Sequence, residues 1–230
     1  MTNAFATNPW FQSLPPHAAN ALLEAATPVS VAAGAFLFRQ GDPMGAGSLA
    51  FFGVASGTLK LSIFNADGDE AILARVEPGN WFGGVSTLDQ QPRGHCAIAL
   101  EDSDVLGVSV ERFEVLMRDA VFAGAIARLV AARLRLAYGS LASAALQGTR
   151  ARVARRIASL AHGDVSQSEE GRASISTSQD ALAMMLGISR QTLSKELQAL
   201  VKLGAIRLRY GHIEIQDMAR LLDASEARSD

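Results

Sequence analysis

The spacing of hydrophobic residues changes along the chain, and each change predicts a different kind of structure. Residues 9–26 contain apolar side chains suited to a short helical segment. From Val29 to about Val110 the apolar residues form short β-branched and aromatic runs separated by glycine. From about Ala120 onward they recur every three or four positions, which is the period of an α-helix. The sequence therefore predicts an α+β protein.

The β-rich region predicts an antiparallel roll or barrel. In one run Leu59, Leu61 and Ile63 occupy alternate positions, the period of a half-buried strand. Asp67 and Gly68 separate this run from the next and predict a hairpin turn, because glycine supplies the positive φ that such turns need. Several short strands with turn signals roughly every ten residues are typical of an antiparallel β-roll.

A single long helix is predicted for residues 120–145. An a/d coiled-coil seam runs through Ala123, Ala127, Val130, Leu134, Ala137, Leu141 and Ala144. A second stripe, suited to packing on the β-roll, consists of Phe122, Ile126, Leu129 and Leu136. At ~1.5 Å per residue this helix is too long for one small roll to cover. The two stripes favour a dimerisation helix, acting through residues 123–144, over a core helix of a single domain.

The segment 177–206 has the pattern of a helix-turn-helix. Thr177 with Asp180 three residues later resembles a capping box at the start of a short helix. Gly187 then permits the left-handed backbone of a tight turn, and Ser189 is placed to cap the next helix. The alternative is a plain helical hairpin with a solvated polar face.

The second helix of this pair has the side chains of a DNA recognition helix. Its apolar face consists of Leu193, Leu197, Leu200 and Val201, and its polar face of Arg190, Gln191, Ser194, Lys195 and Gln198. A recognition helix carries long hydrogen-bonding side chains near its N-terminus, where it enters the major groove. Arg190 is suited to guanine, Gln191 to adenine, and Lys195 to guanine or phosphate. Hydroxyl groups placed for the DNA backbone are those of Thr177, Ser178, Ser189 and Thr192.

The flanking segments complete a winged helix-turn-helix. A basic helix, TRARVARRIASLA, precedes it over residues 149–161, followed by a polar loop at 162–174. After it, Ala205–Arg209 and His212–Ile215 predict a strand pair with a basic edge, which looks like a wing. A closing helix is predicted at residues 217–225.

Charge and composition agree with nucleic-acid binding at the C-terminal end. Residues 1–148 carry a net charge of −4, from 9 basic and 13 acidic residues, and residues 149–230 carry +2, from 12 and 10. No apolar run approaches the ~20 residues of a membrane span, and the N-terminus lacks a secretory pattern, so we expect a cytoplasmic protein without membrane contact. The single cysteine, Cys96, excludes an intrachain disulfide and a four-cysteine metal site within one chain.

Two functions of other classes are possible for such a chain. An enzyme is disfavoured, because the sequence has no P-loop, nucleophile elbow, HExxH or CxxC motif and its four histidines have no metal spacing. A nucleotide-binding module that acts on a protein partner would share the β-roll. Such a module would not require a helix suited to enter a DNA groove and carrying Arg190 and Lys195.

The order of these parts resembles the cAMP receptor protein / fumarate-nitrate reduction regulator (Crp/Fnr) family of bacterial transcription factors over almost the whole chain. The best-matching stretches are GISRQTLSKELQAL (187–200) and WFGGVSTLDQQPRGHCAIA (81–99). The resemblance implies a β-roll effector-sensing domain (1–118), a dimerisation helix (119–146) and a winged helix-turn-helix domain (147–230). It also implies a homodimer on a pseudo-palindromic site, and contact with RNA polymerase if the protein activates.

The residues of the effector cassette depart from the cAMP-binding pattern. The resemblance places the effector at Gly83, Gly84, Val85, Arg93, Gly94, His95 and Tyr138. Gly84 stands where cAMP-binding members have a ribose-binding Glu, and Gly94 with His95 stands in the Arg-Ser slot. The dimer helix has Ala137 and Tyr138 where Thr-Ser is expected. At the DNA end, Gln191 and Lys195 replace the usual Glu and Arg.

These departures predict that cAMP is not the physiological effector. Arg93 remains an anion anchor, which leaves another nucleotide or acidic metabolite, or alternatively an effector-independent regulator. The pair His95-Cys96 is a weaker indication of haem, because adjacent strand residues point to opposite faces. No cofactor is assigned. The sequence does not give the half-site, the target genes, or whether the protein activates or represses transcription.

Overall fold

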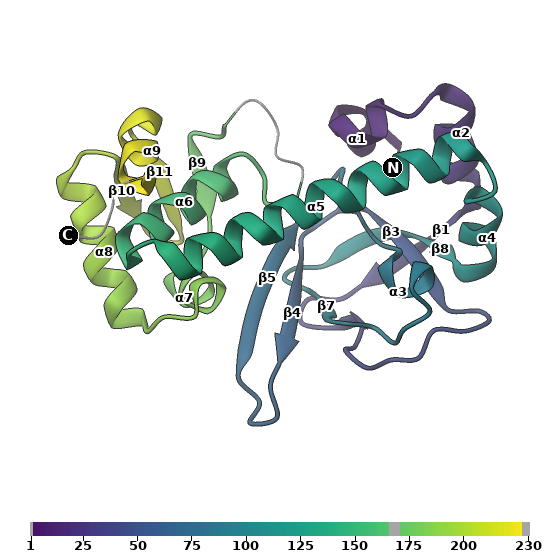
Figure 1. Ribbon diagram of the computed structural model, residues 1–230, viewed down its shortest axis with the longest axis horizontal. Coiled ribbons are helices and arrows are strands. Elements are labelled where there is room, and N and C mark those ends of the chain that lie inside the picture. The colour runs from purple at the N-terminus through teal and green to yellow at the C-terminus, as the bar shows by residue number, and fades with distance from the viewer. Residues whose placement is uncertain (1, 166–170, 227–230) are drawn as a thin grey trace. The chain divides into compact units, whose positions relative to one another are not determined.

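The computed structural model describes residues 2–165 and 171–226 and divides into two compact units, residues 1–133 and 134–230 (Figure 1). Among the helices within these described ranges, none combines the length and apolar character that a bilayer span requires. The polar loop predicted at 162–174 lies partly outside the described residues.

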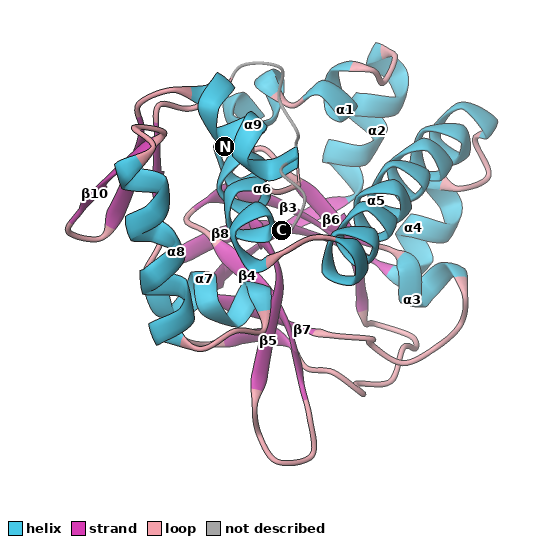
Figure 2. Ribbon diagram, turned by 60° about the vertical axis from the view of Figure 1, so that its left-hand side comes forward, coloured by secondary structure: helices cyan, strands magenta, loops and turns pink. Residues whose placement is uncertain are grey.

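The first unit contains two four-stranded antiparallel sheets, which confirms the predicted β-roll (Figure 2). One has the order β1-β8-β3-β6 and the other β2-β7-β4-β5. Their strands are β1 (Ala26–Val31), β2 (Phe36–Phe38), β3 (Leu49–Ser56), β4 (Leu59–Phe64), β5 (Glu70–Val76), β6 (Trp81–Gly83), β7 (Cys96–Ala99) and β8 (Ser103–Ser109). The helical segments of this unit before the long helix are η1 (Thr2–Thr7), α1 (Pro9–Gln12), α2 (Pro16–Ala25), α3 (Val85–Leu88) and α4 (Val110–Leu116).

The burial pattern predicted for β4 is wrong in its second half. Leu59 is fully buried as expected, but Ser62 is also fully buried and Ile63 is 36% exposed. The pairing of β4 with β5 shifts between Leu61 and Ser62, and such an irregularity reverses the face that later side chains occupy. The buried Ser62 hydroxyl donates to Glu70, at 2.6 Å.

The core of the first unit is aromatic. Trp81 stacks on Phe51 at 5.3 Å between ring centroids, and Phe113 packs against both Phe51 and Phe122. Trp10 in α1 donates from its indole nitrogen to the carbonyl of Ala125, at 2.9 Å. The N-terminal helices are therefore joined to the start of the long helix through both apolar packing and a hydrogen bond.

The long helix, α5 (Ala120–Leu146), has almost the predicted bounds. Phe122 and Ile126 are buried in the core of the first unit, as the second stripe predicted. Leu136, predicted in the same stripe, is instead 38% exposed. In the a/d seam, Leu134 and Leu141 are 49% and 68% exposed.

The second unit is a winged helix fold, as predicted. Its remaining elements are α6 (Thr149–Ala161), β9 (Ser174–Ser176), α7 (Gln179–Leu186), α8 (Arg190–Lys202), β10 (Ile206–Arg209), β11 (His212–Ile215) and α9 (Met218–Glu226). The sheet has the order β10-β11-β9, so β9 adds a strand that the sequence did not predict. Leu182, Leu193 and Leu197 are fully buried in its core, together with Ile157 of α6.

Candidate functional site

The turn between α7 and α8 has the predicted geometry. Gly187 ends α7 in the left-handed region, with φ 61° and ψ 38°. Ser189 caps α8: its hydroxyl accepts from the backbone N–H of Thr192 at 3.1 Å and lies 2.8 Å from the Thr192 hydroxyl. Because glycine adopts this backbone without steric cost, the chain reverses within three residues and α8 begins directly after the turn.

The cap of α7 differs from the prediction by one residue. Ser178, not Thr177, is the N-cap, and its hydroxyl accepts from the backbone N–H of Ala181 at 3.0 Å. Thr177 is buried, with 8% of its surface exposed, so it is not part of the exposed polar surface. Asp180 is not a capping-box partner of Thr177 but lies 3.5 Å from Arg190, in a pair with both side chains more than half exposed.

The faces of α8 match the prediction. Leu193, Leu197 and Leu200 are fully buried. The exposed residues of its first turns and of the preceding caps are Ser178, Ser189, Arg190, Gln191, Thr192 and Lys195, with Ser194 half-buried. The first two turns of α8 therefore present a continuous polar surface of hydrogen-bonding side chains.

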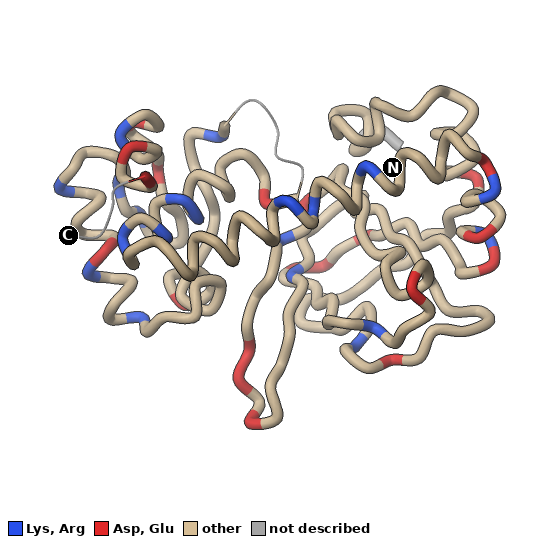
Figure 3. The backbone as a smooth tube through the Cα atoms, viewed as in Figure 1, with Lys and Arg blue, Asp and Glu red and all other residues tan. Residues whose placement is uncertain are grey.

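Three arginines of α6 make polar contacts within the domain. Arg152 donates to the carbonyl of Leu186, the last residue of α7, at 2.6 Å. Arg150 pairs with Glu196 of α8 at 2.9 Å, and Arg156 makes a double hydrogen bond to Asp164, 2.7 Å for each nitrogen. Figure 3 shows that basic residues lie along both α6 and α8. Sequence reasoning identified α6 as basic but not that three of its arginines are engaged internally.

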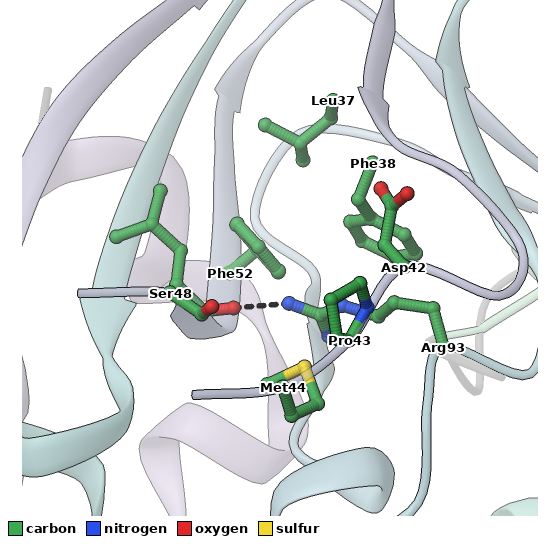
Figure 4. Close-up of a pocket in the computed structure, with 9 residues that line it drawn as sticks. Leu37, Phe38, Asp42, Pro43, Met44, Ser48, Phe52 and Arg93 are labelled. Carbon is green, nitrogen blue, oxygen red and sulfur yellow. Dashed lines mark hydrogen bonds between the residues drawn. The ribbon is translucent and has the colours of Figure 1, made fainter. Parts of the chain in front are cut away.

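Arg93 is the predicted effector residue that lines a cavity. The cavity has a volume of about 300 Å³ and is lined by Leu37, Phe38, Asp42, Pro43, Met44, Ser48, Leu49, Phe52 and Arg93 (Figure 4). The Arg93 guanidinium donates to the carbonyl of Leu49 and lies 4.2 Å from the centroid of the Phe38 ring. Burial lowers the pKa of Arg93 to about 10, although Asp42 acts in the opposite direction.

The other predicted effector residues do not line this cavity. Gly83 and Gly84 have φ values of 90° and 82°, and Gly84 is the N-cap of the short helix α3. A Cβ on Gly83 would lie 2.6 Å from the carbonyl oxygen of Ala50, so this glycine lets β6 approach β3 closely. Val85 and Gly94 are exposed. Tyr138 is 61% exposed and belongs to the part of α5 in the second unit.

His95 lies beside Arg93 in a buried environment. Its ring centroid is 5.6 Å from that of Phe38, and its buried Nε2 has no hydrogen-bond partner among the described residues. Burial lowers the pKa of His95, and the positive charges of Arg93 and Arg133 lower it further. The neighbouring Cys96 is buried, and its sulfur accepts from the backbone N–H of Gln40 at 3.2 Å.

Comparison with known proteins gives matches over both units. Residues 28–120 match the cyclic nucleotide-binding domain, and residues 151–224 match the Crp-like helix-turn-helix domain. The chain is 33% identical over 189 residues to the cyclic AMP receptor protein of Thermus thermophilus, covering 80% of this chain and 85% of that protein. It is 30% identical over 216 residues to a CRP-like cAMP-activated global transcriptional regulator of Mycobacterium tuberculosis, covering 92% and 93%.

Solved structures give the same match. A CRP/FNR-family transcriptional regulator from Thermus thermophilus superposes with a TM-score of 0.71 and 26% identity, covering 88% of this chain and all of that one. These comparisons confirm the resemblance predicted from the sequence.

The environment of His95 predicts a dependence of stability on pH. Because the folded protein disfavours the charged imidazole, the unfolded chain takes up a proton more readily once the pH falls below the ordinary histidine value of 6.5. The free energy of unfolding should therefore decrease between pH 7.5 and 5.5, measured by urea denaturation, and decrease less in His95→Gln. The control is His17→Gln, whose 65% exposed side chain lies 3.4 Å from Asp119; this substitution should not make the decrease smaller. Equal decreases in wild type and His95→Gln would contradict the prediction.

Proposed function

The chain belongs to the Crp/Fnr family of transcription regulators, and from this premise we propose that it binds a pseudo-palindromic promoter site as a homodimer. The family consists of regulators and not of enzymes. The observation that supports the proposal best is the polar start of α8, directly after the Gly187 turn. As a DNA-binding regulator it acts in the cytoplasm, and it contacts RNA polymerase if it activates.

In this proposal α8 enters the major groove. Arg190 reads guanine with two donors, Gln191 reads a neighbouring base edge, and Lys195 contacts guanine or phosphate one turn later. Hydroxyl groups that position the domain on the DNA backbone are those of Ser178, Ser189, Thr192 and Ser194. Thr177 is left out of this set because it is buried.

The dimer forms through the seam of α5 within residues 123–144. Leu134 and Leu141 are exposed in the single chain although they occupy a/d positions, and pairing with a second copy would bury them. A two-fold dimer presents two recognition helices and so requires two half-sites. We assign effector sensing to residues 1–118, dimerisation to 119–146 and DNA binding to 147–230.

The β-roll binds an anionic small molecule other than cAMP. Arg93 is the proposed anchor, since it is a buried cation at a cavity. Gly84 offers no carboxylate for a ribose hydroxyl, and the Gly94-His95 pair offers no hydroxyl for a cyclic phosphate. Each missing hydrogen bond is worth about 1–3 kcal/mol, so the loss of both weakens cAMP binding by orders of magnitude. Some relatives have names that refer to cAMP, but these names describe the relatives and do not identify the effector of this chain.

The first prediction of this proposal concerns Arg190. Arg190→Ala should weaken binding to the protein's own promoter site by about 10–100-fold, because one bidentate base contact is worth about 1–3 kcal/mol. Affinity for a scrambled duplex should change much less, as measured by fluorescence anisotropy, with the site first located by genome-wide mapping of bound DNA. Lys202→Ala, at the other end of α8, is the control and should keep the preference for the site. An equal loss of affinity for all sequences would show that Arg190 contacts a phosphate and not a base.

The second prediction concerns the dimer. Leu141→Glu should shift the protein from dimer to monomer in sedimentation equilibrium, because two seams with this substitution would bring carboxylates together. The single chain should still fold, since Leu141 is 68% exposed in it. Ala132→Glu, on the side of α5 away from the seam, should stay dimeric. A dimeric Leu141→Glu protein would place the interface elsewhere.

The third prediction concerns the effector. In isothermal titration calorimetry, cAMP should bind in the millimolar range or not at all, and should leave promoter affinity unchanged. Micromolar cAMP binding that also improves promoter affinity would overturn this part of the proposal. A protein that binds its site fully in the absence of any added anion would be the effector-independent alternative, and one that binds no DNA would favour a module acting on a protein partner.

A further inference from the structure

Glu214 on β11 lies among three basic side chains of the wing, which comprises β10, β11 and their Tyr210-Gly211 turn. Its carboxylate is 3.1 Å from Nε of Arg209, 3.9 Å from Nη1 of Arg207 and 3.8 Å from Nε2 of His212. Arg207 and Glu214 are direct cross-strand partners, so their side chains lie on one face of the antiparallel pair. One carboxylate therefore serves two arginines.

This face of the wing is its solvent face. The arginine side chains are 57% and 51% exposed, while that of Glu214 is 27% exposed. Ile206 and Ile213, which point to the other face, are buried in the core of the domain. Exposed ion pairs contribute little to folding, typically below about 1 kcal/mol, so the fold does not depend on this carboxylate. Its main effect is on the charge that the wing presents to a partner.

A phosphate and a carboxylate use the same donors of an arginine. Both accept charge-assisted hydrogen bonds from the guanidinium, and both do so with two oxygens. In the wing, the carboxylate of Glu214 already holds Nε of Arg209 and neutralises part of the charge of Arg207. A DNA phosphate that approaches either arginine must therefore compete with Glu214.

We propose that Glu214 is an internal counter-charge that weakens the contact of Arg207 and Arg209 with DNA phosphates. The inference rests on the proposed function, because it requires that the domain binds duplex DNA. Phosphate contacts supply most sequence-independent affinity. A wing restrained in this way leaves a larger share of the binding free energy to α8, which carries the base-reading side chains. Glu214 thus limits binding to DNA of unrelated sequence.

The test is Glu214→Gln in the full-length protein, bound to a duplex of scrambled sequence at salt concentrations from about 50 to 200 mM. The variant should bind several-fold more tightly at low salt, and the slope of log K against log salt should steepen by about 1, the change expected for one phosphate contact. Equal thermal unfolding midpoints of variant and wild type would show that the fold is retained.

Asp217→Asn is the matched control. Asp217 also pairs with an arginine, Arg220 at 3.1 Å, and its side chain is 38% exposed. Its Oδ1 accepts from the backbone N–H of Arg220, a role that asparagine can keep. The two substitutions remove the same charge, so Asp217→Asn should leave affinity and salt slope close to wild type. Equal changes in the two variants would overturn the inference, because they would show an effect of net charge alone.

A second background tests the arginines themselves. Glu214→Gln added to Arg207→Gln/Arg209→Gln should give no gain in affinity, and a persisting gain would also overturn the inference. The outcomes separate the two proposals. If the wild-type protein binds DNA and Glu214→Gln has no effect on this binding, the proposed function stands and only the inference about Glu214 is overturned. If the wild-type protein binds no duplex, specific or scrambled, both the proposed function and the inference are overturned.

Discussion

The direction of α8 depends on how α7 ends. The left-handed conformation of Gly187 turns the chain, and the guanidinium of Arg152 holds the last carbonyl of α7 at 2.6 Å. The final carbonyls of a helix have no partner within the helix, so the partly buried donor at that position fixes the end of α7 against α6. Ser189, two residues after Gly187, then caps α8, which begins at Arg190. The orientation of every side chain on the polar face of α8 follows from these contacts.

The basic residues of the second unit divide into two groups with different roles. Arg152 and Arg156 of α6 are partly buried and engaged within the domain, whereas Arg190, Lys195 and Arg207 are exposed. The number of basic residues in this unit therefore overstates how many of them are free to contact a partner. Two of the exposed arginines also have acidic partners, since Asp180 pairs with Arg190 and Glu214 with Arg207. The exposed pairs are weak and exchangeable, while the buried pair of Arg156 and Asp164 is costly to break.

Local pattern was sufficient to predict much of the architecture. The bounds of α5, the Gly187 turn and the buried leucines of α8 follow from helical period and from the backbone that glycine permits. Features that depend on contacts between distant segments were not predictable. The buried Ser62 follows from a register shift against β5, and strand β9 forms only by pairing with β11. The choice of Ser178 over Thr177 as N-cap rests on which side chain the core buries.

The predicted effector cassette shows the same division more sharply. Gly83 is required by the close approach of β6 to the carbonyl of Ala50, so a backbone constraint is sufficient to explain this glycine. The surroundings of Arg93, the proposed anion anchor, depend instead on contacts between separate segments. Arg93 comes from the loop before β7 but is engaged by the carbonyl of Leu49 and the ring of Phe38. An anion that binds Arg93 must exchange these contacts for its own, so its affinity depends on the difference between two sets of interactions. Residues 28–120 match the family's nucleotide-binding domain, whereas His95, which does not line the cavity, is a position at which this chain departs from the cAMP-binding pattern.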